Sequence, residues 1–200
     1  MACYQPVLKL AALSGTRVVN NPFWRIADDK FFDAALAERL GIHVPRTFVL
    51  PSHSWGEGVT SESLTNLALP IDWQRIADEL GFPMYLKPHC CGGWGDVHRV
   101  SSLEELFGAY DRSGCETMPL QEEIAWTQYV RCIVVGREEV LPALWDPRRW
   151  HYDRYVCADE SMPPLAREQV DELSGLSRKL CRALGYDMNT IEWAIRGGVP

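Results

Sequence analysis

The chain has 200 residues, of which 46% are hydrophobic and 24% are charged, and its formal net charge is −7. This composition is typical of a globular protein with one large domain or two small lobes. The acidic balance, with no clustered basic stripe, excludes a nucleic-acid surface. No apolar run approaches the roughly 20 residues of a membrane-spanning helix, and residues 1–16 lack the basic start of a signal peptide.

Seven cysteines at irregular spacing predict a reduced, cytoplasmic chain without a disulfide framework. His89, Cys90, Cys91 and His98 form a cluster that invites a metal interpretation. Adjacent cysteines rarely chelate one zinc ion together, and no second Cys-x-x-Cys pair closes a tetrahedral site. Small apolar loop residues are therefore favoured over zinc, and the role of Cys90 and Cys91 stays open.

The first half of the chain predicts short elements that are separated by loops. Carboxylates before residue 30 and Gly41 after residue 40 mark the two ends of a helix. Ser101 or Ser102 is expected to cap another helix that ends near Arg112. The expected elements are a helix over residues 30–40, a loop running into a strand over 42–50, a long surface loop over 51–70, a helix over 71–80, and strands over 84–87 and 97–100.

The second half predicts a β-hairpin, a long helix and a further strand. These elements are strands over residues 129–135 and 139–145, a helix over 165–184 and a strand over 189–196. Gly197-Gly198 predicts a type I′ turn. Because a partner strand would naturally follow such a turn, we expect the chain to be truncated at its C-terminus, and residues 1–28 to be the remnant of a preceding domain or linker.

The most informative segment is Tyr85-Leu-Lys-Pro-His-Cys-Cys-Gly-Gly-Trp-Gly-Asp-Val-His98. A short strand delivers Lys87, and a glycine-rich loop follows it. This order suits a triphosphate, because the lysine supplies a fixed cation and glycines let backbone N–H groups approach phosphate oxygens. The alternative is a glycine-rich turn that closes a hairpin, with Lys87 extending from the strand end into solvent.

Five segments follow one another in an order that resembles a known superfamily. They are the helix from Asp29-Lys30 to Leu40-Gly-Ile-His-Val-Pro-Arg-Thr47, Gly81-Phe-Pro-Met-Tyr-Leu-Lys-Pro88 with its glycine loop, Leu120-Gln-Glu-Glu-Ile124, a hairpin with Arg131, and Leu184 to Gly198. Over residues 15–200 this resembles the ATP-grasp superfamily, on the side of glutathione-synthetase-like carboxylate–amine ligases. The resemblance implies an α/β (α+β) fold with antiparallel sheets and flanking helices in two lobes, residues 29–116 and 117–200, incomplete at the C-terminus.

The resemblance also implies roles for particular residues. Among the implied ATP-binding residues, Lys30 and Lys87 would contact the phosphates, and Gly92, Gly93 and Gly95 would form a mobile loop over them. Glu122, Glu123 and Ile124 would form a hinge whose backbone groups bind the adenine edge. Gln128 would lie near the ribose. Arg131 would face the γ-phosphate or acyl-phosphate. Glu192 would be the first acidic magnesium ligand, and the remaining ligands would follow Pro200. Taken alone, Lys30 is a solvated helix residue, Glu122 and Glu123 are an acidic turn, and Glu192 is an exposed strand residue.

The implied activity is ATP- and Mg²⁺-dependent ligation of a small-molecule or peptide carboxylate to an amine through an acyl-phosphate. The alternative is a non-catalytic nucleotide-binding or structural protein of the same fold. Residues 145–155 are dense in aromatic and cationic side chains, so Arg149, His151 or Arg154 is a candidate to hold a substrate carboxylate. The same residues equally suit an ordered surface loop with cation–π contacts. The sequence does not reveal the substrate pair or the oligomeric state.

Overall fold

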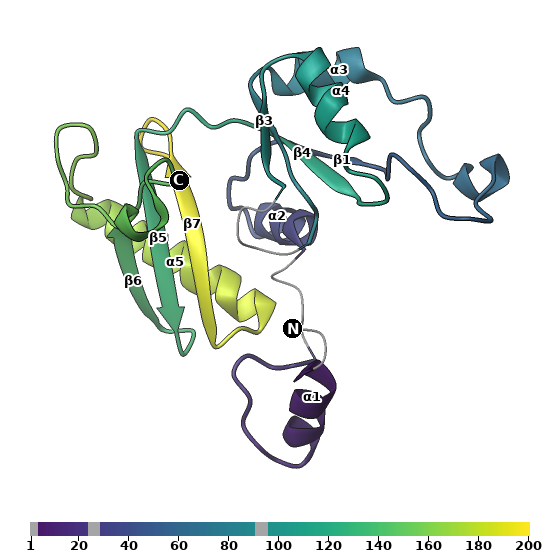
Figure 1. Cartoon of the computed structure of the whole chain (residues 1–200). Helices are drawn as coiled ribbons and strands as arrows, with labels where there is room; N and C mark the ends of the chain where they lie inside the picture. The colour runs from purple at the N-terminus through teal and green to yellow at the C-terminus, as the bar shows by residue number, and fades with distance from the viewer. Residues whose placement is uncertain (1–3, 24–28, 91–95) are drawn as a thin grey trace. The chain divides into compact units, whose positions relative to one another are not determined.

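The computed structural model describes residues 4–23, 29–90 and 96–200. Contacts divide the chain into two compact units. Unit 1 comprises Met1–Ile26, Leu36–His43 and Ile124–Pro200, and unit 2 comprises Ala27–Ala35 and Val44–Glu123. Figure 1 shows the elements of both units, coloured from the N-terminus to the C-terminus.

The elements alternate along the chain much as the sequence predicts. The helices are α1 (Gln5–Leu13), α2 (Lys30–Arg39), α3 (Trp73–Leu80), α4 (Leu103–Asp111) and α5 (Arg167–Leu184), with short 3₁₀ helices η2 (Ser61–Leu64) and η3 (His151–Asp153). The strands are β1 (Thr47–Leu50), β2 (Met84–Leu86), β3 (His98–Val100), β4 (Met118–Glu122), β5 (Gln128–Val135), β6 (Glu139–Leu144) and β7 (Met188–Ile195).

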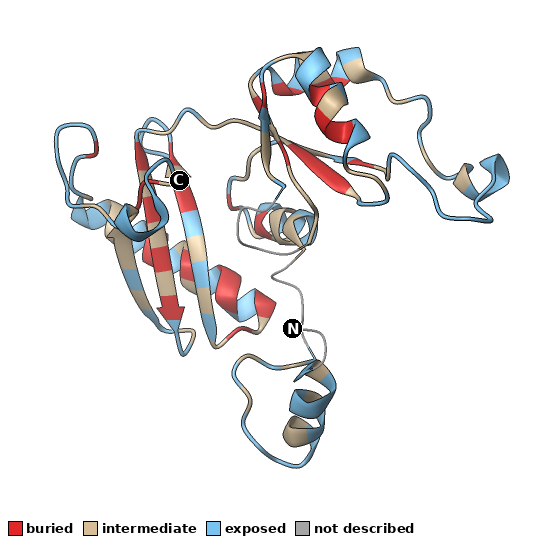
Figure 2. Ribbon diagram, in the orientation of Figure 1, coloured by how far each residue is buried: buried red, intermediate tan, exposed pale blue. Residues whose placement is uncertain are grey.

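Unit 2 contains a four-stranded antiparallel sheet with the strand order β1-β4-β2-β3. Alternate strand residues on one face pack with α3 and α4 into a core that is fully buried (Figure 2). Side chains anchor the helix starts: Asp72 accepts a hydrogen bond from the Arg75 N–H, and Ser102 accepts one from the Glu105 N–H. The core residues with 0–1% exposure are Leu50, Met84, Leu86, Leu106 and Leu120.

The opposite face of this sheet carries polar side chains. Gln121 on β4 pairs with Thr47 on one side and with Tyr85 on the other, and Tyr85 in turn pairs with Arg99. Because directly paired residues point to the same face, these four side chains form one polar row across the sheet. The side chains of this row could form hydrogen bonds with a ligand, whereas the opposite face of the sheet is covered by helices.

Unit 1 contains a three-stranded antiparallel sheet with the order β6-β5-β7. The β5 residues Val130, Cys132 and Val134 are fully buried, and α5 packs on that side (Figure 1). The indole of Trp193 on β7 donates a hydrogen bond to the Ser177 hydroxyl of α5 at 3.1 Å, which ties helix and sheet together. Gly185 ends α5 in the left-handed conformation, as the sequence predicts.

The turn after β7 confirms the predicted two-residue hairpin. Gly197 and Gly198 have φ values of 61° and 84°, and Arg196 and Val199 exchange both backbone hydrogen bonds. Both positive φ values are what a type I′ turn requires.

Some elements were not predicted from the sequence. Helix α1 lacks a side-chain N-cap and buries none of its residues, so neither a cap nor a periodic core face marks it. The short helix η2 interrupts the loop predicted over residues 51–70. Strand β4 pairs with β1 and β2, so it belongs to the sheet of unit 2. The two units divide after Glu123. The lobe boundary between residues 116 and 117 stays a prediction. Of the helices in the described ranges, none is both long and apolar enough to cross a membrane.

Candidate nucleotide site

Lys87 lies at the end of β2 in unit 2, and Lys30 contacts the backbone of the residues that follow it. Lys87 directly follows the strand, and its Nζ donates a hydrogen bond to the side-chain oxygen of Gln121 at 2.7 Å. Lys30 begins α2, and its Nζ donates to the Pro88 carbonyl at 2.9 Å and to the Cys90 carbonyl at 3.4 Å. The Lys30 N–H also donates to the His89 carbonyl at 2.9 Å. The fold therefore holds Lys30 against the residues that follow Lys87.

Lys87 is positioned through a relay of neutral side chains. The Gln121 amide that accepts from Lys87 donates in turn to the Thr47 hydroxyl at 2.9 Å. The Lys87 N–H is fixed as well, because it donates to the Pro119 carbonyl at 3.1 Å. Lys87 thus extends the polar row of the sheet, on the face away from α3 and α4.

The predicted phosphate loop lies just beyond these lysines. Gly92, Gly93, Gly95 and Cys91 fall within residues 91–95, which lie outside the described residues. Their role therefore stays a prediction. The described residue that follows, Asp96, has a φ of 55°, in the left-handed region that turns favour.

The carboxylates of Glu122 and Glu123 are each held by an arginine. Glu122 accepts from the Arg46 N–H at 2.8 Å and from the Arg46 guanidinium at 2.9 and 3.2 Å. Glu123 accepts from Arg99 Nε at 2.8 Å, Arg99 Nη2 at 3.0 Å and the Tyr85 hydroxyl at 3.0 Å. The hydrogen bonds from Arg99 hold the pKa of the Glu123 carboxyl below its ordinary value. Both carboxylates therefore already accept hydrogen bonds from side chains of unit 2.

The backbone groups next to these carboxylates have fewer hydrogen-bond partners. The Glu123 N–H donates to the Pro83 carbonyl at 3.3 Å, and the Ile124 carbonyl accepts from the Trp126 N–H at 2.9 Å. Within the described ranges, the Glu123 carbonyl and the Ile124 N–H have no hydrogen-bond partner. These two groups belong to one trans peptide unit, so the carbonyl and the N–H point in opposite directions.

In unit 1, Arg131 and Glu192 are cross-strand partners on β5 and β7. They lie on the face opposite α5, with 3.9 Å between Arg131 Nε and Glu192 Oε1. The Tyr129 hydroxyl donates to Glu192 at 2.9 Å, and the Arg131 guanidinium lies 4.3 Å from the ring centroid of Trp145. The Arg131 Nε is buried and has no hydrogen-bond partner among the described residues.

Glu192 does not form a complete magnesium site with the described residues. Magnesium prefers six oxygen ligands in an octahedral arrangement. In the parts of the chain that the structure describes, no three His, Cys, Asp or Glu side chains are grouped to hold a metal. Glu192 offers a single carboxylate, which Tyr129 and Arg131 already orient.

Gln128 is 6% exposed and links three parts of unit 1. Its amide nitrogen donates to the Pro163 carbonyl at 2.9 Å, and its oxygen accepts from Gln169 of α5 at 3.0 Å. These contacts connect β5 to the segment that precedes α5. The predicted contact of Gln128 with ribose is an additional role, which stays a prediction.

Residues 145–155 form an ordered loop with the predicted cation–π contacts. Asp146 accepts from the Arg148 guanidinium at 2.9 and 3.0 Å, which holds the pKa of the Asp146 carboxyl below its ordinary value. The guanidinium of Arg148 lies 4.4 Å from the ring centroid of Trp126, and that of Arg154 lies 5.7 Å from the ring centroid of Trp145. Arg149, Trp150, Tyr152, Asp153 and Tyr155 line a cavity of about 520 Å³, and His151 is exposed beside Tyr152.

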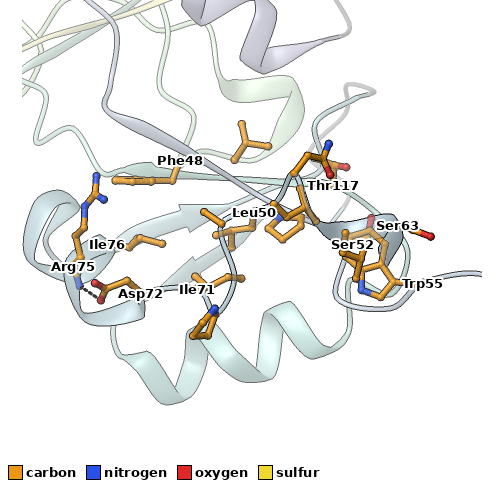
Figure 3. Close-up of a pocket in the computed structure, with 17 residues that line it drawn as sticks. Phe48, Leu50, Ser52, Trp55, Ser63, Ile71, Asp72, Arg75, Ile76 and Thr117 are labelled. Carbon is orange, nitrogen blue, oxygen red and sulfur yellow. Dashed lines mark hydrogen bonds between the residues drawn. The ribbon is translucent and has the colours of Figure 1, made fainter. Parts of the chain in front are cut away.

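A separate, mostly apolar cavity of about 590 Å³ lies in unit 2 between β1, α3 and residues 51–70 (Figure 3). Phe48, Leu50 and Ile76 point into it, with Trp55 and Ser63 at the loop side. At one edge the Arg75 N–H donates a hydrogen bond to the Asp72 side-chain carboxylate at 3.0 Å. None of the residues predicted to bind ATP lines this cavity.

Comparisons with known proteins agree with this geometry. No family model matches the chain. It is 30% identical over 203 residues to a D-alanine–D-alanine ligase from Ralstonia nicotianae, covering 90% of this chain and 61% of that protein. The structure of the Coxiella burnetii D-alanine–D-alanine ligase matches 97% of this chain with a TM-score of 0.70 at 15% identity, over 51% of that chain. The chain has the fold of ATP-grasp ligases.

A second solved structure, that of the ATP-grasp ligase PsnB complexed with a minimal precursor, Mg and ADP, matches the whole chain with a TM-score of 0.62 at 15% identity. The chain covers 56% of PsnB. This ATP-grasp chain therefore spans between about half and three fifths of the length of the relatives it matches.

The ATP-grasp fold gathers only part of the predicted residue set within each unit. Unit 2 brings Lys30 to the end of β2 beside Lys87, and unit 1 pairs Arg131 with Glu192. Sequence reasoning missed the partners of the two glutamates, Arg46, Tyr85 and Arg99. A local signal does exist for Tyr85 and Lys87, which alternate along one short strand, but no local signal links Arg46 or Arg99 to the glutamates.

Proposed function

We propose that this chain forms the nucleotide-binding part of an ATP-dependent ligase that joins a carboxylate to an amine. The observation that carries the proposal is the contact of Lys30 with the Pro88 and Cys90 carbonyls, directly after Lys87 and on the N-terminal side of the glycine-rich segment. Two ammonium groups at one strand end suit a polyphosphate, because each neutralises charge on the phosphoryl oxygens. The names of the relatives, D-alanine–D-alanine ligase and PsnB with Mg and ADP, support the same reaction class.

The proposed reaction has two steps. A carboxylate oxygen attacks the γ-phosphorus of ATP, which forms an acyl-phosphate and releases ADP. An amine then attacks the acyl carbon, the phosphate leaves, and an amide remains. Neither step requires a nucleophilic side chain, so the protein contributes positioning and charge stabilisation.

The ammonium group of Lys87 is held in position before a ligand binds. Its ammonium group donates to the Gln121 oxygen, and the Thr47 hydroxyl holds the Gln121 amide in turn, so little reorganisation is needed when phosphate oxygens arrive. In unit 1, the unpartnered and buried Nε of Arg131 gives a second donor for an anionic group. We assign Arg131 to the γ-phosphate or acyl-phosphate on that basis.

Adenine would be read by backbone groups of the segment Glu122, Glu123 and Ile124, and Gln128 would lie near the ribose. Glu192 is the proposed ligand for magnesium, but the described residues do not complete its coordination, so no step is assigned to the metal. For the loop of residues 145–155 we propose substrate binding, with Arg149 at its cavity as the first candidate and with His151 and Arg154 beside it.

The test compares the whole chain with its Lys87→Met and Lys9→Met variants. Lys9 lies on α1 of unit 1 and is not among the residues proposed to bind ATP, and Lys9→Met removes the same charge. Millimolar ATP should raise the melting temperature of the unmodified chain and of Lys9→Met, because a ligand that binds only the folded state stabilises it. Lys87→Met should lose most of this shift. An equal shift in Lys87→Met, or none in the unmodified chain, would refute the proposal.

Release of ADP then separates a ligase from a protein that only binds nucleotide. D-Alanine is the first substrate to supply as both carboxylate and amine, because the curated relative is named for it. ADP formation that requires D-alanine, or another carboxylate and amine from a panel of amino acids and dipeptides, supports ligation. Nucleotide-dependent stabilisation without ADP formation on the whole panel would leave binding as the function.

A further inference from the structure

The apolar cavity of unit 2 runs along the outer edge of β1, which is the first strand in the sheet order β1-β4-β2-β3 (Figure 3). Successive strand residues point to opposite faces, so a cavity on one face of a sheet would be lined by alternate residues only. This cavity is lined by consecutive residues along β1 and just after it, which are Phe48, Val49, Leu50, Pro51 and Ser52. Its wall therefore includes the backbone edge of the strand.

The backbone groups of Val49 face this edge. The Glu122 N–H of β4 donates to the Arg46 carbonyl, so the backbone groups of Arg46 point towards β4. The N–H and carbonyl of one strand residue point to the same side, and this side alternates along the strand. Those of Phe48 therefore face β4, and those of Val49 face away from it. Within the described ranges, neither the N–H nor the carbonyl of Val49 has a hydrogen-bond partner.

We propose that this cavity binds an extended peptide segment of another protein, which adds to β1 as an antiparallel strand. A peptide residue opposite Val49 would exchange two backbone hydrogen bonds with it, as antiparallel pairs do. Main-chain bonds of this kind supply affinity, and pockets for alternate side chains supply specificity. The proposal is independent of the proposed nucleotide site, because none of the residues proposed to bind ATP lines the cavity.

The cavity selects apolar side chains on both sides of the peptide residue that pairs with Val49. That residue would point to the polar face of the sheet, as Val49 does. Its two neighbours would lie opposite Phe48 and Leu50, on the face of the apolar core, and extend into the cavity beside Ile76 of α3. The cavity volume of about 590 Å³ is within the range of ligand sites in proteins. The expected pattern is therefore apolar–polar–apolar.

Arg75 marks one end of the cavity and Pro51 the other. Arg75 lines the end where Phe48 lies, and its Nε donates to Glu79 at 2.7 Å (Figure 3). The two terminal amino groups of its guanidinium have no hydrogen-bond partner among the described residues. The C-terminal end of an antiparallel peptide would lie on this side, so an acidic residue after the second apolar one would be charge-complementary to Arg75. At the other end the pairing would stop, because Pro51 has no N–H and its carbonyl accepts from the Tyr110 hydroxyl at 2.7 Å.

A second copy of this chain fits the cavity less well than a separate peptide. Its own β1 would offer Phe48 and Leu50 as the apolar pair, but Leu50 is 1% exposed and packs in the core of its own unit 2. Pairing of two β1 strands would therefore leave both cavities unfilled.

The experiment measures the fluorescence anisotropy of labelled peptides that are mixed with the full chain. The probe is fluorescein-Gly-Ser-Leu-Thr-Leu-Glu-amide. The first control peptide, with the order Gly-Ser-Leu-Leu-Thr-Glu, keeps the composition and breaks the alternation. The second control peptide carries N-methylthreonine, which keeps every side chain and removes the N–H that would donate to the Val49 carbonyl. We expect both control peptides to bind at least about fivefold more weakly than the probe.

Two changes at Val49 form the matched pair of variants. Val49→Pro removes the outward N–H, which takes no part in the pairing with β4, and should lose most of the affinity for the probe. Val49→Ala keeps this N–H and should bind the probe as the unmodified chain does. The shift in melting temperature caused by ATP should stay unchanged in both variants, because Val49 is not among the residues proposed to bind ATP.

Equal affinity of the unmodified chain for the probe and the N-methylated peptide overturns the inference, even if Val49→Pro fails to fold. A probe that causes no rise in anisotropy also overturns it. Self-association of the chain that Val49→Pro abolishes would make a second copy the occupant, with the same consequence. These results leave the proposed nucleotide function intact, whereas selective binding of the probe by a chain that binds no ATP would support this inference alone.

Discussion

Arg99 on β3 grips both oxygens of Glu123 at the end of β4, with Nε 2.8 Å from Oε1 and Nη2 3.0 Å from Oε2. The two residues do not pair directly, because β2 lies between their strands. The Tyr85 hydroxyl from β2 joins the same carboxylate. One carboxylate thus connects three strands of unit 2 on the polar face of the sheet.

This connection predicts how acid changes the stability of unit 2. The pKa of Glu123 is lowered in the folded state, so its stabilising effect is complete above the ordinary carboxyl value of 4.5 and is lost as the pH falls through the folded-state value. The Glu123→Gln variant should therefore unfold at lower temperature than the unmodified chain at pH 7, with a gap that narrows towards pH 3. Thermal unfolding followed by circular dichroism at both pH values measures the gap. A gap of the same size at pH 3 contradicts the assignment, and Glu160→Gln, on an exposed turn, is the control.

Gln128 should be important for the stability of unit 1. Gln128→Ala leaves the Pro163 carbonyl and the Gln169 amide without their buried partner, which costs about 1–3 kcal/mol of the free energy of unfolding. Urea unfolding measures this loss. Gln74→Ala removes an exposed amide that bonds Asp78 on α3, and it should change the free energy by less than about 0.5 kcal/mol. Equal effects of the two changes would show that the Gln128 links do not stabilise the fold.

Leu120 lies at the centre of the core of unit 2 and has no exposed surface. Leu120→Ala should lower the free energy of unfolding by about 2–5 kcal/mol, because it removes buried methyl groups and leaves a cavity. Leu141 on β6 is 61% exposed, so Leu141→Ala is the matched change at the surface and should cost little. A loss below about 1 kcal/mol at Leu120 would mean that the core is less tightly packed than the structure indicates.

The cysteines should differ in their reaction with alkylating reagents. Burial raises the pKa of the Cys132 thiol to about 11, and it also raises the pKa of the Cys181 thiol, so neither forms much reactive thiolate at pH 8. Cys115 and Cys157 are exposed. Peptide mass spectrometry after brief iodoacetamide treatment should find label at Cys115 and Cys157, and at Cys132 and Cys181 only after unfolding in urea. Labelling of Cys132 in the native chain would contradict its buried position on β5.

Much of the fold could be predicted because its signals are local. The cap at Ser102, the left-handed Gly185 and the hairpin turn at Gly197-Gly198 all depend on residues close in sequence, and the structure confirms each of them. Helix α1 could not be predicted, because a helix that buries nothing shows no periodic core face. The family could be predicted from the order of loose motifs, although each motif alone was ambiguous.

The candidate site also has a part that the sequence predicts and a part that only the structure shows. The sequence by itself determined the residue types that suit a nucleotide: a lysine at a strand end, a glycine-rich segment and a pair of glutamates. Only the tertiary structure decided that Lys30 contacts the Pro88 carbonyl and that Arg46 and Arg99 clamp the glutamates. The physical reason is the strand order β1-β4-β2-β3, which brings together residues far apart in the chain. In that order one face of the sheet buries its apolar side chains with α3 and α4, and no short stretch of sequence carries this arrangement.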